Sequence, residues 1–137
     1  MAECIPQLSL DCHPTVPLMV TFAAPPISGD GGVLLLRPMD ERLGLSARLA
    51  ALLPDERDPR KVKHARREQV RQRLYPIALG YPDCNDADRL RQDPVLKSVG
   101  GRSPQAEDLS SQPTLLRLEN AVDMRTLRTL LREIEEP

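Results

Sequence analysis

Only three aromatic side chains occur in this sequence of 137 residues: Phe22, Tyr75 and Tyr81. Apolar residues of all kinds still make up 40% of the chain, so a core has to be built mainly from leucine, valine and alanine. Leucine and alanine are strong helix formers, and a chain of this length is the size of one small domain with its own core. The sequence therefore predicts a mainly α protein, a small helical domain.

Proline content sets the N-terminal part of the chain apart. The sequence contains 14 prolines, roughly twice the average frequency of about 5%, and the first segment holds Pro6, Pro14, Pro17, Pro25 and Pro26. We expect residues 1–30 to form an extended or poorly ordered tail. Residues 15–23 (TVPLMVTFA) have the β-branched content of a short strand, which Pro17 would restrict to a sheet edge. The helical domain is expected over residues 31–137.

The spacing of apolar residues predicts where the helices lie. Leucines recur at helical spacing over residues 33–53, but Pro38 and Gly44 interrupt the pattern. We expect two short helices there, over residues 33–43 and 47–53, with Ser46 as the N-cap of the second. Besides a short turn capped by Asp83 or Asn85, the other expected helices cover residues 60–79, 94–99, 110–122 and 123–136.

Four aspartates cluster in the stretch LGYPDCNDADRLRQDP: Asp83, Asp86, Asp88 and Asp93. Their spacing begins like a calcium-binding loop, but Arg89 and Arg91 occupy ligand positions and would repel a cation. Asp86 and Asp88 are two residues apart, so on a helix they point in different directions, unlike a general acid–base pair. We instead expect Asp83 and Asp86 to cap a helix and Asp88 to pair with Arg91.

Cysteine, histidine and glycine residues give no pattern of a cofactor or catalytic site. The three cysteines form no Cys-x-x-Cys pair, and a metal held by Cys4, Cys12 and His13 would lack a fourth ligand. Neither a glycine-rich phosphate-binding motif nor the spacing of a catalytic triad is present. The longest apolar run, residues 33–36, is too short to span a bilayer, and no secretion signal begins the sequence. We expect a cytoplasmic protein that binds no metal or cofactor through these residues.

The basic run RDPRKVKHARREQVRQR, residues 57–73, carries eight Lys or Arg side chains against two carboxylates. The formal net charge of the whole chain is −1, so any nucleic-acid surface has to come from such a local patch. On a helix over residues 60–79, one face would carry Arg60, Lys63, Arg67 and Arg71. Such a stripe could bind DNA phosphates, and the alternative is an ordinary solvated helix face.

The stretch SSQPTLLRLEN, residues 110–120, resembles the start of a recognition helix in a helix-turn-helix unit. In that interpretation Gln112, Thr114 and Arg117 reach base edges, while the core side is formed by Leu115, Leu116 and Leu118. The preceding helix of such a unit is not evident in residues 102–109. The alternative is an ordinary helix capped by serine.

Three longer stretches together resemble the N-terminal region of bacterial insertion-sequence transposases of the DDE type, group 1. They are GGVLLLRPMDERLGL (31–45), RQRLYPIALGYPDCNDADRLRQDPVLK (71–97) and SSQPTLLRLENAVDMRTL (110–127). The resemblance covers residues 15–131, and the order and spacing of the stretches match as well. It implies a helical region that precedes a ribonuclease-H-like catalytic domain, in which three acidic residues hold two divalent metals.

No residue of this chain matches a catalytic acid of that family, whose first aspartate would follow the last expected helix. The resemblance thus implies a truncated transposase-like protein without the catalytic domain: no enzyme, no metal, and at most DNA binding at transposon ends. Pro38, Pro76 and the pair Arg66–Arg67 depart from the family pattern and suggest sequence drift. One alternative is a fragment that pairs with a full-length transposase, and another is a non-functional remnant.

Overall fold

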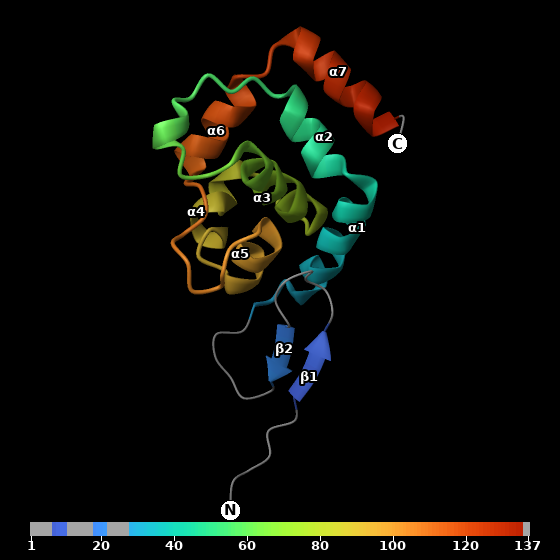
Figure 1. Cartoon of the computed structure of the whole chain (residues 1–137), viewed down its shortest axis with the longest axis vertical. Helices are drawn as coiled ribbons and strands as arrows, with labels where there is room; N and C mark the ends of the chain where they lie inside the picture. The colour runs from blue at the N-terminus through green and yellow to red at the C-terminus, as the bar shows by residue number, and fades with distance from the viewer. Residues whose placement is uncertain (1–6, 11–17, 22–27, 136–137) are drawn as a thin grey trace, which may run out of the picture.

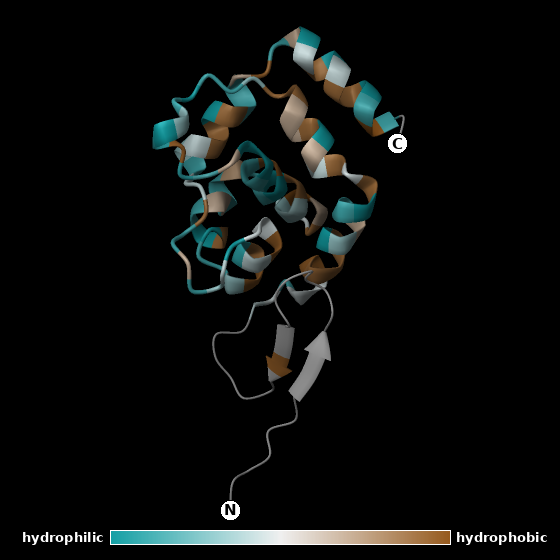
Figure 2. Cartoon of the chain, in the orientation of Figure 1, coloured by the Kyte–Doolittle hydropathy of each residue, from teal (hydrophilic) through white to brown (hydrophobic). Residues whose placement is uncertain are grey.

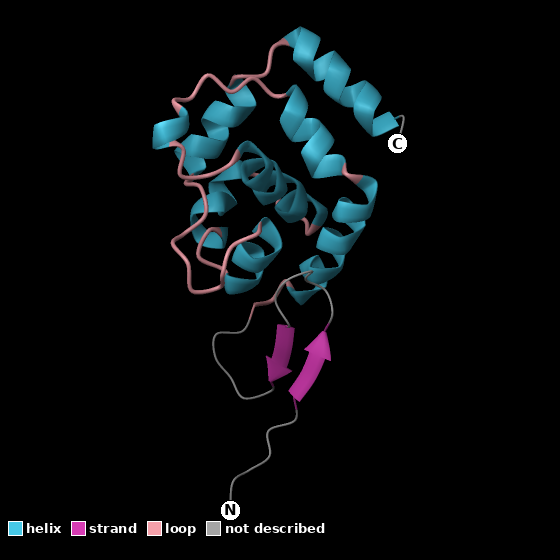
Figure 3. Cartoon of the chain, in the orientation of Figure 1, coloured by secondary structure: helices cyan, strands magenta, loops and turns pink. Residues whose placement is uncertain are grey.

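The computed structural model describes residues 7–10, 18–21 and 28–135 (Figure 1). These residues are mainly helical, which confirms the predicted fold class (Figure 3). Among them are seven α-helices: α1 (Leu36–Leu43), α2 (Leu45–Leu52), α3 (Arg66–Ala78), α4 (Ala87–Leu90), α5 (Pro94–Gly100), α6 (Gln112–Asn120) and α7 (Met124–Glu135). Three short 3-10 helices accompany them: η1 (Gly31–Leu35), η2 (Pro59–Lys61) and η3 (Cys84–Asp86).

Two short strands precede the helices. β1 (Gln7–Leu10) and β2 (Leu18–Thr21) pair antiparallel, with Gln7 opposite Thr21. The strand expected within residues 15–23 is therefore confirmed, and each strand of a two-stranded sheet is an edge strand. Strand β1 agrees with an extended tail, but it was not predicted as a strand, because its regular structure depends on pairing with β2. The remainder of that prediction lies outside the described residues, at 1–6, 11–17 and 22–27.

The predicted break between the first two helices is present at Gly44. This residue has a φ of 67°, the left-handed conformation that glycine adopts readily, and it separates α1 from α2. Pro38 lies in the first turn of α1, where a missing backbone donor is tolerated. Ser46 is not an N-cap as predicted. It lies inside α2, fully buried, and its backbone N–H and hydroxyl both donate to Asp40 at 2.6 Å.

The third expected helix is shorter than the sequence predicted. Residues 59–61 form η2, and α3 begins only at Arg66, so the expected helix 60–79 is interrupted between them. Pro76 lies in the last turn of α3, and the helix ends two residues later. Ile77, an apolar residue in the last turn of α3, is exposed. Helix α3 packs against α2, α5 and α6, so residues on several of its sides are buried, and some of these buried residues are polar.

The remaining helices follow the prediction closely. Asp93 caps α5 by accepting the backbone N–H groups of Val95 and Leu96 at 2.8 and 3.0 Å. The helices expected at 110–122 and 123–136 are α6 and α7. Residues 101–111 contain no helix, so no helix directly before α6 completes a helix-turn-helix unit there.

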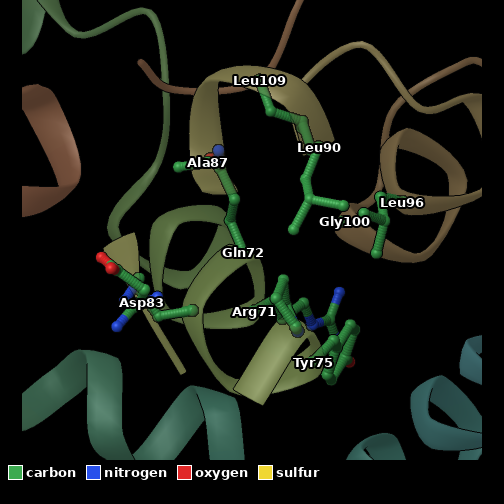
Figure 4. A pocket seen from close by; sticks show the side chains of 11 residues that line it. Arg71, Gln72, Tyr75, Asp83, Ala87, Leu90, Leu96, Gly100 and Leu109 are labelled. Atoms are coloured by element: carbon green, nitrogen blue, oxygen red, sulfur yellow. The ribbon is translucent and has the colours of Figure 1, made fainter. Parts of the chain in front are cut away.

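The core has two apolar clusters. The larger joins Val33, Tyr75, Leu90, Leu96, Val99 and Leu109, and the smaller joins Cys84, Ala87, Leu115 and Leu118. Leu116, predicted to face the core with its neighbours, is 42% exposed. A cavity of about 10 Å³ remains between Gln72, Tyr75 and Leu90 (Figure 4). That volume has room for about one water molecule, so the larger cluster is closely packed.

None of the described helices has the length and apolar content that crossing a membrane requires.

Candidate nucleic-acid interface

The four members of the predicted cationic stripe do not lie on one helix. Arg60 is in η2 and Lys63 in the connection that follows it, whereas Arg67 and Arg71 are in α3. The first three side chains are exposed and the fourth is buried. The expectation of one continuous helical face was therefore wrong, because the helix breaks between η2 and α3.

Arg71 belongs to a buried polar cluster around Asp40. Its Nε donates to the Asp40 carboxylate at 3.0 Å, and the hydroxyl of Tyr75 donates to the same oxygen at 2.9 Å. Ser46 adds the two bonds described above. Burial acts to raise the pKa of Asp40, but the bonds from Ser46, Tyr75 and Arg71 outweigh it and hold that pKa below its usual value. Burial, together with the neighbouring carboxylate, raises the pKa of Tyr75.

Arg67 lies on the same side of α3 as that cluster. Its Nε is 3.2 Å from the hydroxyl of Ser46, while its side chain reaches solvent. Its hydrogen-bond partner thus belongs to the Asp40 cluster and not to the segment that carries Arg60 and Lys63.

Ion pairs and hydrogen bonds join residues within the segment that leads into α3, residues 54–66. Nε and Nη2 of Arg57 donate to the carboxylate of Asp55 at 2.6 and 2.7 Å, and Nη1 donates to the carbonyl of His64 at 3.0 Å. Arg66 lies 2.9 Å from the same carboxylate and donates to the carbonyl of Pro54 at 2.7 Å. The hydrogen bond from Arg57 is the main reason that the pKa of Asp55 falls to about 2.

A second group of bonds holds the end of this segment against α3. Arg102 donates from Nε to Glu68 at 2.6 Å and from Nη2 to the carbonyl of Lys63 at 2.7 Å. Nδ1 of His64 lies 2.9 Å from Glu68 as well. The backbone that carries Lys63 is therefore fixed to α3 at two points.

Two grooves lie between this segment and α6. The first, of about 650 Å³, is bordered by Lys61, Lys63, His64 and Thr114. Arg57 and Arg91 bring further positive charge to it, and the acidic residues at its wall are Glu107 and Asp108.

The second groove, of about 590 Å³, is bordered by Arg57, Arg66, Thr114 and Arg117. Arg57, Gln69 and Thr114 border both grooves, so the two hollows adjoin. The structure thus brings Lys63, Thr114 and Arg117, from two separately predicted sets, to adjoining grooves. Sequence reasoning missed Arg57 and Arg66 as members of this surface, although both lie in the basic run.

The aspartate cluster supports the position of α6. Asp88 accepts the backbone N–H of Gln112 at 3.1 Å, so it caps α6 across 24 residues of sequence. The side-chain amide of Gln112 donates to Asn85 at 3.0 Å. Ser111, the expected cap, makes no such bond to the helix backbone. No signal in the sequence pairs Asp88 with α6, because the contact depends on the tertiary fold.

Two predictions about the aspartates are confirmed and one is wrong. Asp83 caps η3 by accepting the N–H of Asn85 at 2.8 Å, and Asp88 lies 3.7 Å from Arg91. Asp86 makes no capping bond and instead lies 3.7 Å from Arg89. A cap at this position is already provided by Asp83, since η3 runs directly into α4.

The carboxylates of the described residues do not fit a two-metal site. No group of three or more His, Cys, Asp or Glu side chains in these residues is arranged to hold an ion. Asp83, Asp88 and Asp93 accept backbone N–H groups at helix starts, and Asp40 is enclosed by Ser46 and Arg71. We therefore derive no metal-dependent step from this part of the chain.

Comparison with known proteins identifies the family. Neither the curated proteins nor the solved structures gave a match to the chain. A family model described as transposase DDE domain group 1 matches residues 14–136, which is most of the sequence. The resemblance carried by the three quoted stretches is thereby confirmed. The chain belongs to the transposase DDE domain group 1 family.

Proposed function

We propose that the helical region of this chain serves DNA transposition by binding DNA along the two adjoining grooves. The observation that carries the proposal is the convergence of the basic segment and the start of α6 on those grooves. A DNA-transposition role agrees with the family to which the chain belongs.

In this proposal the residues divide by position. Lys63 is exposed at the wall of the first groove, and Arg60 is exposed in η2, next in sequence to the groove residue Lys61. Both bind phosphates in this proposal. Thr114 in the first turn of α6 and Arg117 in its last turn reach toward base edges in this proposal. Phosphate contacts position a protein on DNA and base contacts give it sequence preference.

Three other predicted residues contribute less to the proposed DNA contact. Arg67 is exposed on α3 but outside both grooves, so we propose a peripheral phosphate contact for it. The side chain of Gln112 is half-buried and bonded to Asn85, which leaves it at the edge of the contact. Arg71 is bonded inside the protein and has a structural role in this proposal.

We further propose that residues 28–135 bind DNA without cleaving it. The support is the engagement of the clustered aspartates as helix caps and ion-pair partners. The two divalent metals that the family chemistry requires would then be held by acidic residues other than these.

A salt titration of DNA binding tests the proposal. Fluorescence anisotropy with a duplex from an element end, repeated at several salt concentrations, gives the slope of log affinity against log salt. Each phosphate contact contributes about 0.9 to that slope, so Lys63→Ala and Arg60→Ala should each reduce it by about that amount. Arg125→Ala, an exposed arginine on α7, is the matched control and should leave the slope unchanged.

Two results would count against the proposal. A slope that Lys63→Ala and Arg60→Ala leave unchanged would remove the grooves as the binding surface. Metal-dependent nicking of plasmid DNA by the purified chain would contradict the proposal that residues 28–135 bind DNA without cleaving it.

The second candidate function is association with a full-length transposase. The observation that favours it is the apolar face of α7, which is exposed in this chain. Co-purification of the two proteins tests it, and recovery of the full-length protein alone would argue against it.

A further inference from the structure

The carboxylate of Asp55 is held by two arginines at once. Nε and Nη2 of Arg57 donate to its two oxygens at 2.6 and 2.7 Å, and the backbone N–H of Arg57 donates to the first of them at 3.3 Å. Nη2 of Arg66 lies 2.9 Å from that same oxygen. Asp55 belongs to the loop 53–58 between α2 and η2, along which Figure 2 shows mostly hydrophilic residues.

This arrangement of donors is one that also suits a phosphate group. A phosphodiester presents two unbridged oxygens and one negative charge, much as a carboxylate does. A guanidinium binds either of them through two parallel N–H···O bonds. The donors that surround Asp55 can therefore serve a DNA phosphate in its place.

Both arginines lie at the proposed DNA surface. Arg57 borders the first and the second groove, and Arg66 borders the second. The charged wall residues of the second groove are Arg57, Arg66 and Arg117, together with one carboxylate, Glu56. Asp55 borders neither groove, but its side chain is 35% exposed, so solvent and ligands reach it. A phosphate that enters the second groove therefore competes with Asp55 for the two guanidinium groups.

Bonds to uncharged groups hold the two arginines in place independently of that carboxylate. Nη1 of Arg57 donates to the carbonyl of His64 at 3.0 Å. Arg66 donates to the carbonyl of Pro54 at 2.7 Å and to the side-chain oxygen of Gln69 at 3.2 Å. Both guanidinium groups keep these bonds when the carboxylate is exchanged for a phosphate, so few side-chain torsions have to be newly ordered.

We propose that Arg57 and Arg66 form a binding site for one phosphate group of the DNA backbone, and that Asp55 occupies this site until DNA replaces it. The site rests on the proposed DNA contact at the grooves and adds two arginines to the phosphate contacts of Arg60 and Lys63. Asp55 then lowers the affinity for all duplexes alike, because a phosphate contact carries no sequence information.

DNA binding by Asp55→Asn at constant salt tests the proposal. The asparagine keeps the size of the side chain and an oxygen for the Arg57 N–H, but it lacks the charge that competes with phosphate. We expect the affinity for duplex DNA to rise about fivefold, as for the release of exposed ion pairs. Glu56→Gln is the matched control, because it makes the same change in charge at the next residue, on the groove wall. It should raise the affinity by less than about twofold.

The same substitution in an Arg57→Ala background separates release of the arginines from a general change in charge. There Asp55→Asn should lose most of its gain, because one of the two guanidinium groups that bind the phosphate is missing. Circular dichroism confirms that each variant is folded. A gain that Glu56→Gln matches, or one that persists in full in the Arg57→Ala background, would overturn the proposal.

A measurement without DNA distinguishes this site from the proposed function. Inorganic phosphate, added at constant ionic strength, should raise the thermal unfolding midpoint of Asp55→Asn more than that of the native chain or of Glu56→Gln. An equal response of all three proteins would overturn the phosphate site. A selective rise without a gain in DNA affinity would show that the arginines take free phosphate, and would overturn the DNA backbone as their ligand.

The two proposals fail in different ways. If the native chain binds DNA through Lys63 and Arg60 while Asp55→Asn adds nothing, the phosphate site is overturned and the DNA contact stands. If no variant binds DNA, the proposed function is overturned, and with it the DNA backbone as the ligand of Arg57 and Arg66.

Discussion

Nε of Arg71 donates to the carboxylate of Asp40 over 3.0 Å, and both side chains are buried. The two residues are 31 positions apart and join α3 to α1. Arg71, which was predicted to bind DNA, therefore helps to hold α3 against α1. Its loss should reduce stability first, and affect binding only through the fold.

Asp40→Asn should destabilise the protein strongly. The amide cannot accept all of the bonds that Ser46, Tyr75 and Arg71 donate, and it leaves the buried arginine with Glu41, 3.6 Å away, as its remaining carboxylate. Breaking a buried pair in this way costs about 3–5 kcal/mol. Urea unfolding followed by circular dichroism measures the loss. Glu107→Gln, at an exposed carboxylate, should change the midpoint little, and an equal loss in both variants would contradict the role of the cluster.

The stability of the protein should also fall as the pH is lowered, because of Asp40. Its pKa in the folded protein is below the usual aspartate value of 3.8, so its contribution to stability is present above that pH and is lost as the pH falls through the folded pKa. Asp55, with a pKa of about 2, acts in the same direction, although solvent screens it more. Urea midpoints measured from about pH 5 downward should decline in the native chain and decline less in Asp40→Asn. Parallel curves for the two proteins would refute this assignment.

Asp88→Ala should loosen the start of α6. Removing the acceptor of the Gln112 N–H costs about 0.5–2 kcal/mol, the usual range for a helix cap. Asp86→Ala is the matched control, because that carboxylate lies two residues earlier and makes no capping bond. Hydrogen exchange of the first amides of α6 should accelerate in Asp88→Ala alone. Similar exchange in both variants would show that Asp88 does not hold the helix.

Gly44→Ala should destabilise the break between α1 and α2. The space around this position is open, so the cost is the left-handed backbone itself, about 1–2 kcal/mol for an alanine. Gly32→Ala, also in open space but without a positive φ, should have a smaller or opposite effect. Thermal unfolding of both variants gives the comparison, and an unchanged Gly44→Ala midpoint would argue against the strain.

Local sequence signals were sufficient for the features that depend on neighbouring residues. Gly44 separates two helices, and Asp93 before Pro94 starts another, because both effects act within one turn. The fold class followed from the aliphatic composition. The strand β2 was indicated by its β-branched residues, whereas β1 was missed because its regularity depends on pairing with β2.

Features that depend on contacts between residues far apart in the sequence could not be predicted from local sequence signals. Apolar periodicity treated α3 as a helix with one buried face, but neighbours on several sides bury Gln69, Arg71 and Gln72 as well. The cap from Asp88 to α6 and the anchor from Arg102 to Lys63 join residues far apart in sequence. The candidate site was therefore predicted in its residue types, and only in part in its arrangement.

Thr114 and Arg57 stand where the two grooves meet. A ligand short enough to lie in one groove meets only half of the surface, whereas a longer one has to cross this boundary to reach the other half. Affinity should therefore rise in a step with oligonucleotide length and not in proportion to it. A bulky residue in place of Thr114 would block the passage between the two grooves. The chain would then bind long and short ligands with similar affinity.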